Sequence, residues 1–166
     1  AKRGTLLDVE EGAGLLLPSC GMTLTAKTDR MDRTPEGLVW IYDYKTGTPP
    51  TPAQQKKFNK QLHITAFLAE SGGFSRLGPL LVAGAEYIGL GSTPKTVAAD
   101  FDAVPLDTVQ DSLHTLFTKY LNPEQGYTAQ VARETMGDYS DYDQLSRGGE
   151  WDTTQEAVTI KVGDHL

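Results

Sequence analysis

A short apolar run that stops abruptly places the strongest constraint on the fold. Residues 38–41 are Leu-Val-Trp-Ile, a pattern typical of a buried β-strand. Residues 46–50, Thr-Gly-Thr-Pro-Pro, cannot continue that strand, because proline has no backbone N–H to donate. Asp43 and Lys45 stand at the exit. Side chains two residues apart in a strand share a face, so this acid and amine lie together, either as a surface ion pair or as part of a metal site.

A second alternating segment precedes this strand. Residues 22–33 alternate in the manner of a strand, and residues 34–37, Thr-Pro-Glu-Gly, match a type I turn with Pro at its second position and Gly at its fourth. We therefore predict a hairpin over residues 22–45. Pairing in this hairpin can bring Asp29 across from Asp43 on one face. Two carboxylates and a lysine would then converge at the end of the sheet.

The other elements predict an α/β fold with mixed strand directions. Residues 14–18 and 80–91 are expected to form further strands. Helices are expected over residues 51–71, with Thr51 as the N-cap, and over residues 105–121. The buried stripe of the first helix is predicted to consist of Phe58, Leu62, Thr65, Ala66 and Ala69.

Composition restricts the functional classes. The single cysteine, Cys20, excludes an internal disulfide and a cysteine-rich zinc or iron–sulfur site, and favours a reducing, cytoplasmic setting. No apolar run approaches the length of a membrane span. The net charge of −7 argues against broad affinity for nucleic acid. It does not exclude a nucleic-acid enzyme, because a divalent metal can supply local positive charge and a partner chain can supply the binding channel.

Asp29, Asp43 and Lys45 together would suit phosphodiester hydrolysis. Mg²⁺ prefers oxygen ligands and usually keeps several waters. Two carboxylates hold such an ion, and a water bound to it becomes a better nucleophile. A neighbouring lysine can orient that water or stabilise charge on the phosphate. Asp-x-Lys alone is a common pattern, so the order of the surrounding segments has to decide between a surface ion pair and a metal site.

That order resembles the PD-(D/E)XK nuclease superfamily, and specifically its RecB-like nuclease domain. Residues 26–32 (Ala-Lys-Thr-Asp-Arg-Met-Asp), residues 43–47 (Asp-Tyr-Lys-Thr-Gly) and Gln61 match the family pattern in order and spacing. Residues 43–74 look most like the AddB subunit of alphaproteobacterial-type helicase–nucleases. The resemblance covers most of residues 8–151 and implies a restriction-endonuclease-like α/β core, with a mixed central sheet flanked by helices.

The resemblance also implies roles for individual residues. Asp29 corresponds to the first metal ligand, Asp43 to the second, and the backbone carbonyl of Tyr44 to a third oxygen. Lys45 corresponds to the catalytic lysine. Gln61 corresponds to a helical glutamine near the active site and DNA. The implied cofactor is Mg²⁺, with Mn²⁺ as an alternative.

The sequence departs from the family pattern in two respects. Ala26 replaces the usual Gly, Thr28 the usual Ile, and Thr65 a frequent Tyr. The early helix that often brings a Glu or His to the metal has no clear counterpart. Glu10 or Glu11 could substitute, although Val-Glu-Glu-Gly favours a solvated loop.

Other polar residues have simpler interpretations. Asp32 is predicted to form a surface pair with Arg30 or Arg33 rather than to bind metal. His63 is predicted to be structural or close to DNA. Residues 137–144 are expected to form an acidic, solvated loop. Two interpretations explain the cluster of Lys56, Lys57 and Lys60 equally well: a solvated helix face, or contacts with phosphate.

The resemblance implies a metal-dependent DNA exonuclease that acts in DNA-end resection for double-strand break repair and recombination. Residues 1–151 would form its nuclease domain, as part of a longer subunit, and residues 152–166 a tail. The implied partners are DNA, an AddA-type helicase–nuclease subunit and the rest of its own subunit, with no membrane. Two alternatives stay open: a catalytically weak structural or DNA-binding module, and another PD-(D/E)XK enzyme such as a restriction-type endonuclease.

Overall fold

The structure is a computed structural model that describes residues 4–127, 144–145, 147, 150–151, 154, 156 and 158. The chain divides into two compact units, Ala1–Thr118 and Lys119–Leu166, and the fold below is that of the first. The acidic loop predicted at 137–144 and the tail predicted at 152–166 lie almost entirely outside the described residues. Within the described part, no helix combines the length and apolar character that a membrane span requires.

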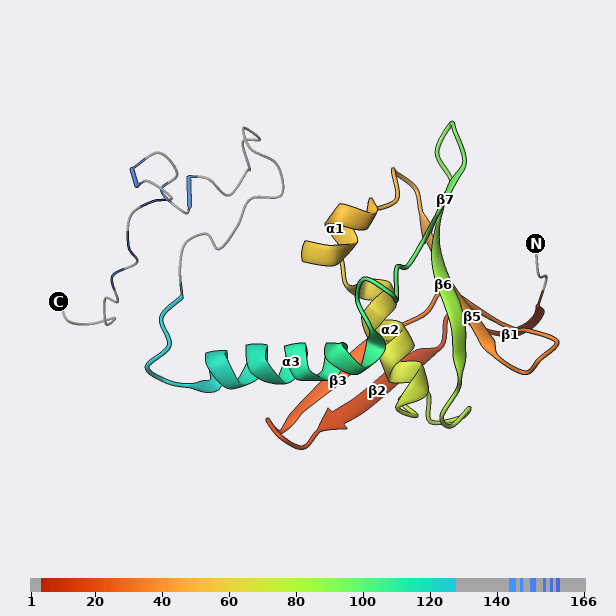
Figure 1. Ribbon diagram of the computed structural model, residues 1–166, viewed down its shortest axis with the longest axis horizontal. Coiled ribbons are helices and arrows are strands. Elements are labelled where there is room, and N and C mark those ends of the chain that lie inside the picture. The colour runs from red at the N-terminus through yellow and green to blue at the C-terminus, as the bar shows by residue number, and fades with distance from the viewer. Residues whose placement is uncertain are drawn as a thin grey trace. The chain divides into compact units, whose positions relative to one another are not determined.

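A five-stranded mixed sheet forms the centre of the first unit, in the order β1-β4-β5-β6-β7 (Figure 1). Its strands are β1 (Thr5–Val9), β4 (Arg30–Arg33), β5 (Val39–Lys45), β6 (Val82–Gly89) and β7 (Lys95–Ala98). All neighbouring pairs are antiparallel except β5 and β6, which are parallel. The predicted mixed sheet is thus confirmed, whereas the short edge strands β1 and β7 were not foreseen.

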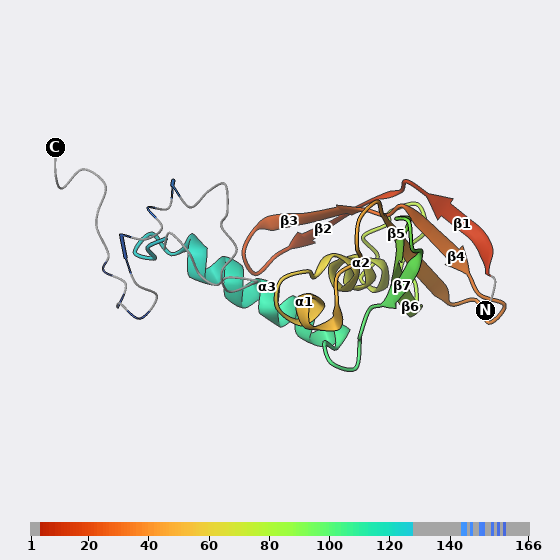
Figure 2. The ribbon, with the colours of Figure 1, turned by 90° about the horizontal axis from the view of Figure 1, so that it is seen from above.

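The parallel pair requires a crossover connection, which two helices provide. These are α1 (Pro52–Lys57) and α2 (Gln61–Glu70), and they lie on the same side of the sheet in both views (Figures 1 and 2). Val39 and Ile41 of β5 point into the core beneath α2, where Leu62 and Ala66 are also fully buried. Asp43 continues this inward-facing row, which explains why a carboxylate is buried at the strand end.

The segment predicted as one strand over residues 22–33 is two strands. Its first part is β3 (Met22–Lys27), which pairs with β2 (Gly12–Leu17) in a separate two-stranded sheet. Its second part is β4, so the hairpin predicted over residues 22–45 is confined to β4 and β5.

The break between β3 and β4 is fixed by hydrogen bonds to the link between β1 and β2. Thr28 N donates to Glu11 O (3.0 Å), and Glu10 N donates to Asp29 O (3.2 Å). Glu10 has φ 54°, in the left-handed region that few residues other than glycine adopt. The chain therefore bends at Glu10, and the bend separates the two sheets beside Asp29.

The helix predicted over residues 51–71 is also divided. The predicted cap is confirmed: Thr51 Oγ1 accepts from Gln54 N (3.3 Å) and Gln54 Oε1 accepts from Thr51 N (2.8 Å), a capping box. However, α1 ends at Lys57. Phe58, predicted to be buried, is 43% exposed because the helix stops before it, whereas the other four residues of the predicted stripe are buried.

The last helix, α3 (Leu106–Leu121), matches its prediction closely. Val109 is buried and packs in a cluster with Leu17 of β2 and Phe67 of α2. Within the first unit, this contact closes the core at the end where the two-stranded sheet meets α2.

Candidate active site

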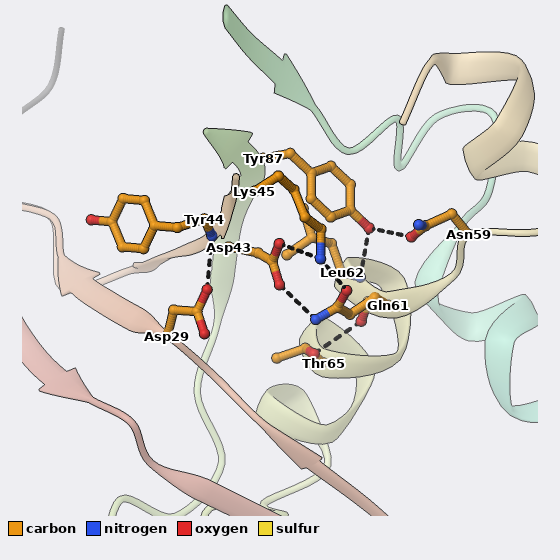
Figure 3. A network of polar contacts seen from close by, with 9 residues as sticks. All are labelled: Asp29, Asp43, Tyr44, Lys45, Asn59, Gln61, Leu62, Thr65 and Tyr87. Carbon is orange, nitrogen blue, oxygen red and sulfur yellow. Dashed lines mark hydrogen bonds and ion pairs between the residues drawn. The ribbon is translucent and has the colours of Figure 1, made fainter. Parts of the chain in front are cut away.

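The end of β5 carries an acid and an amine in direct contact. Asp43 is only 5% exposed, and its Oδ2 lies 2.7 Å from Lys45 Nζ (Figure 3). The contact is ionic rather than a well-directed hydrogen bond, because the geometry leaves this buried oxygen without a hydrogen-bond partner. The side chain of Lys45 is 30% exposed, so its ammonium group reaches from the buried carboxylate towards the surface.

Gln61, the first residue of α2, joins the acid and the amine. Its Nε2 donates to Asp43 Oδ1 (2.5 Å), and its Oε1 accepts from Lys45 Nζ (2.8 Å) (Figure 3). A side-chain amide has a donor end and an acceptor end, so one glutamine can serve a carboxylate and an ammonium at once. The three side chains form a closed ring of contacts, which we call the Asp43–Lys45–Gln61 ring.

Asp29 lies beside this ring, just before β4. Arg30 pairs with Tyr42, so the antiparallel register places Asp29 opposite Asp43. Asp29 Oδ2 accepts a hydrogen bond from the backbone N–H of Tyr44 (2.7 Å), which ties the carboxylate to the end of β5 (Figure 3). The structure therefore brings Asp29, Asp43, Lys45 and Gln61 together. It does not test the catalytic and metal-binding roles assigned to them, which stay predictions.

The electrostatics of the site disfavour a charged Asp43. Burial raises the pKa of this carboxyl above its ordinary value; Lys45 opposes the shift, Asp29 adds to it, and Gln61 opposes it. Two carboxylates and a single ammonium leave an excess of negative charge at the strand end. A small cation is the kind of ligand that such a site would attract.

Comparison with protein families identifies a superfamily that matches most of the chain. The family model described as the PD-(D/E)XK nuclease superfamily matches residues 1–155. The chain belongs to this superfamily. Its mixed sheet flanked by helices is the predicted restriction-endonuclease-like α/β fold. Membership suggests nuclease activity, and nucleases of this superfamily typically use divalent metal ions. In a comparison with curated proteins, nothing matched the chain significantly.

In this PD-(D/E)XK domain, the two other candidate ligands already have cationic partners. Glu10 forms an ion pair with Lys27. Glu11 accepts from Arg76 Nε (3.0 Å) and Nη2 (2.6 Å), and the same Nη2 lies 2.7 Å from Asp8. In the part of the chain that the structure describes, no three His, Cys, Asp or Glu side chains are grouped so as to hold a metal ion. The candidate donors are thus two carboxylates and the Tyr44 carbonyl.

Two further predictions concern Asp32 and His63, and one of them needs a correction. Asp32 pairs with Arg30 through both oxygens (2.7 and 2.9 Å), as predicted, but Asp32 is buried, at 4% exposed, rather than on the surface. His63 is structural: it is fully buried, its Nε2 lies 3.3 Å from Asp100 O, and its ring meets Phe101 edge-on at 5.4 Å. Burial lowers the pKa of His63, so it is enclosed as a neutral ring.

Two residues beneath the PD-(D/E)XK site, Tyr87 and Asn59, were not predicted to belong to it. Tyr87 of β6 is fully buried, and Lys45 Nζ lies 5.5 Å from the centroid of its ring. The Tyr87 hydroxyl donates to Asn59 Oδ1 (2.7 Å) and accepts from Leu62 N (3.3 Å) (Figure 3). Alternation along residues 80–91 could have placed Tyr87 on the inward face. Its partners, 25 and 28 residues away, leave no local signal.

Proposed function

We propose that this chain is a metal-dependent DNA nuclease domain whose catalytic residues are Asp29, Asp43, Lys45 and Gln61. The observation that carries the proposal is the closed Asp43–Lys45–Gln61 ring beside Asp29. A surface ion pair would not need a buried carboxylate, a second acid within electrostatic range and a glutamine that bridges both charges. Superfamily membership independently favours phosphodiester hydrolysis.

The donor set fits a hard divalent cation, for which we propose Mg²⁺, with Mn²⁺ as the alternative. Asp29 and Asp43 would hold it, together with the carbonyl of Tyr44. The buried Asp43 Oδ2 has an ion pair with Lys45 but no well-directed hydrogen bond, so it could accept such a partner. When bound, the ion lowers the pKa of a coordinated water and offsets negative charge on the phosphate. Two carboxylates suffice because such an ion usually keeps several waters.

Lys45 and Gln61 supply the remaining functions. The ammonium of Lys45 can orient the attacking water or stabilise the charge that develops on the phosphate. A cation at Asp43 Oδ2 would compete with Lys45 for that oxygen. Gln61 Oε1 would still accept from Lys45 Nζ, which keeps the ammonium in the site. Gln61 Nε2 would still hold Asp43 Oδ1 and so fix the orientation of the carboxylate.

We further propose the biological setting of this activity. The likeness of residues 43–74 to AddB-type subunits supports an exonuclease that resects DNA ends during double-strand break repair and recombination in the cytoplasm. Residues 1–151 would be the nuclease domain and residues 152–166 its tail. An AddA-type helicase–nuclease subunit and the rest of an AddB-type subunit would be its partners, and motor activity would lie outside this chain.

The decisive experiment measures Mg²⁺-dependent cleavage of single- and double-stranded DNA by the chain and by Lys45→Ala. We expect Lys45→Ala to reduce the rate by about 100-fold or more, as the loss of a group that stabilises transition-state charge does. Lys95→Ala, on β7, is the matched control and should keep the parent rate. Equal rates for the parent chain and Lys45→Ala would refute the proposed role of Lys45.

A second candidate function is a catalytically weak, nuclease-like module that binds DNA or supports its complex. It is favoured by the absence, among the described residues, of a third His, Cys, Asp or Glu that could join the metal site. In that case the parent chain would not cleave DNA at any Mg²⁺ concentration, and Lys45→Ala would leave its DNA affinity unchanged.

A further inference from the structure

Tyr87 contacts the candidate active site at two places. Tyr87 pairs with Asp43 in the parallel register of β5 and β6, so the two side chains are neighbours on the inward face. The ring lies beneath Lys45, with the ammonium 5.5 Å from the ring centroid, within the range of a cation–π contact. The hydroxyl reaches the other way, to the first turn of α2.

The first turn of α2 needs an external hydrogen-bond acceptor. The first backbone N–H groups of a helix have no partner within the helix. The residue before the helix, Lys60, makes no side-chain cap. The Tyr87 hydroxyl, from a strand of the sheet, accepts instead from Leu62 N at 3.3 Å. Gln61 is the residue immediately before Leu62, so this hydrogen bond anchors the turn that carries Gln61.

Asn59 fixes the direction of that hydroxyl. Asn59 Oδ1 accepts a hydrogen bond from the Tyr87 hydroxyl at 2.7 Å. This directs an oxygen lone pair of Tyr87 towards Leu62 N. Asn59 lies in the link between α1 and α2, so the same contact ties that link to β6. Burial raises the pKa of Tyr87 to about 12, so the hydroxyl stays protonated and acts as a fixed donor and acceptor.

We propose that Tyr87, oriented by Asn59, is a positioning residue of the active site. Its hydroxyl fixes the position of the first turn of α2, and hence of Gln61, while its aromatic ring fixes the position of the Lys45 ammonium. This proposal rests on the proposed nuclease function. It also explains the break between α1 and α2. In a continuous helix, Asn59 and Leu62 would belong to one regular backbone. Here the helix is interrupted between them, and the Tyr87 hydroxyl forms a hydrogen bond with each through its single oxygen.

Tyr87→Phe tests the hydroxyl while it keeps the ring beneath Lys45. We expect hydrogen exchange of the Leu62 amide, followed by NMR, to accelerate about fivefold to tenfold, as the loss of one hydrogen bond predicts. Amides in the last turn of α2 should keep their exchange rates. At saturating Mg²⁺ and DNA, kcat should fall about tenfold while KM stays within twofold, because Gln61 acts on the reacting groups rather than on substrate affinity.

Four further variants separate positioning from general stability. Tyr42→Phe, on the neighbouring strand, removes a hydroxyl outside this network and should change neither exchange at Leu62 nor kcat. Asn59→Ala should reproduce Tyr87→Phe, and the double variant should be no worse than either single variant, because the two groups act as one unit. Asn59→Asp keeps an acceptor for the Tyr87 proton and should restore most of kcat.

The outcomes distinguish this proposal from the function on which it rests. If the parent chain does not cleave DNA, the nuclease proposal fails, and selective exchange at Leu62 still tests the structural half of the present one. If Tyr87→Phe accelerates exchange uniformly along α2, or leaves Leu62 unchanged, Tyr87 does not position the helix start. Normal kcat in Tyr87→Phe with fast exchange at Leu62 would also overturn the proposal.

Discussion

Two pairs of opposite charge lie on neighbouring strands with the same spacing. In β4, Arg30 and Asp32 are two residues apart; in β5, Asp43 and Lys45 are two residues apart. Arg30 holds both oxygens of Asp32, at 2.7 and 2.9 Å, and this contact is the largest cause that raises the pKa of Arg30. Lys45 reaches one oxygen of Asp43, whose pKa burial raises. In the first pair one guanidinium serves both oxygens of the carboxylate, whereas in the second the ammonium reaches one oxygen and Gln61 serves the other.

The difference follows from the shape of the two cations. The guanidinium group is a planar fork that matches a carboxylate with two parallel hydrogen bonds, whereas the ammonium is a point charge that leaves lone pairs unused. The two buried aspartates, Asp32 and Asp43, therefore serve different ends. One is suited to hold the sheet together, and the other retains capacity to bind a further positive group.

Among changes to the cations of the two pairs, the largest expected effect comes from giving β5 the cation of β4. In Lys45→Arg, the guanidinium should saturate Asp43 as Arg30 saturates Asp32, and so compete with metal. We expect Mg²⁺-dependent cleavage to fall about 100-fold, with the midpoint of urea unfolding unchanged or raised. Cleavage assays beside calorimetric Mg²⁺ titration measure both effects. Full activity in Lys45→Arg would show that the two pairs do not differ in the way proposed.

The next effect concerns the saturated pair. Arg30→Ala leaves the buried Asp32 without its guanidinium, which should lower the free energy of unfolding by about 2 kcal/mol. This is below the range for fully buried pairs because the Arg30 side chain is 40% exposed. Arg30→Lys, the matched control, should cost about half as much, because it keeps the charge and loses the fork. Urea denaturation measures both; a loss of cleavage at unchanged stability would assign Arg30 a functional role instead.

Asp43→Asn is expected to change the free energy of unfolding less than Arg30→Ala does, and in the opposite direction. Because burial raises the pKa of Asp43 above its ordinary 3.8, the native protein binds this proton more tightly than the unfolded chain. The stability from that proton is fully present below pH 3.8 and is lost as the pH rises through the raised pKa. Metal-free Asp43→Asn should therefore match the parent in acid and exceed it at neutral pH, by up to about 1 kcal/mol.

Denaturant unfolding in EDTA across a pH series measures that difference, and cleavage by Asp43→Asn should be abolished. Loss of the fold in this variant would instead identify Asp43 as a structural acceptor comparable to Asp32.

The smallest effect is expected in DNA binding by the isolated chain. The chain has 15 Lys and Arg against 22 Asp and Glu, and Arg30, Lys45, Lys27 and Arg76 are each paired with a carboxylate, so the net positive charge offered to phosphate is small. We expect weak binding of a fluorescent single-stranded oligonucleotide, with Ca²⁺ in place of Mg²⁺, and a shallow dependence on salt. Anisotropy across a salt series measures both. Tight binding at physiological salt would show that this chain carries its own DNA path.

Short-range patterns predicted much of this molecule. The inward row of β5 and its polar exit, the Thr51 cap and the extent of α3 are each set by residues within one or two turns of each other. The predicted hairpin pairing indicated Asp29 and the resemblance added Gln61, and the structure places both beside Asp43 and Lys45. Candidate site residues could thus be named before their contacts were known.

What the sequence could not predict depends on distant partners. Residues 22–33 alternate without interruption, and the break beside Asp29 arises from hydrogen bonds with Glu10 and Glu11, which link β1 to β2. Residues 58–60 have no helix breaker, and the division of α1 from α2 coincides with the contact of Asn59 to Tyr87. In both places the local sequence allows one continuous element, and a tertiary contact divides it.

The parallel pairing of β5 with β6 has a consequence for the order of folding. Val39 and Val82 are register partners although the whole crossover separates them, so this contact closes a long loop and forms late compared with local hairpins. Asp43 and Lys45 are on one strand of this pair, and Tyr87 is on the other. A newly synthesised chain would therefore keep Tyr87 away from Asp43 and Lys45 until this long-range contact closes, and under the proposed function cleavage would begin only in the completed domain.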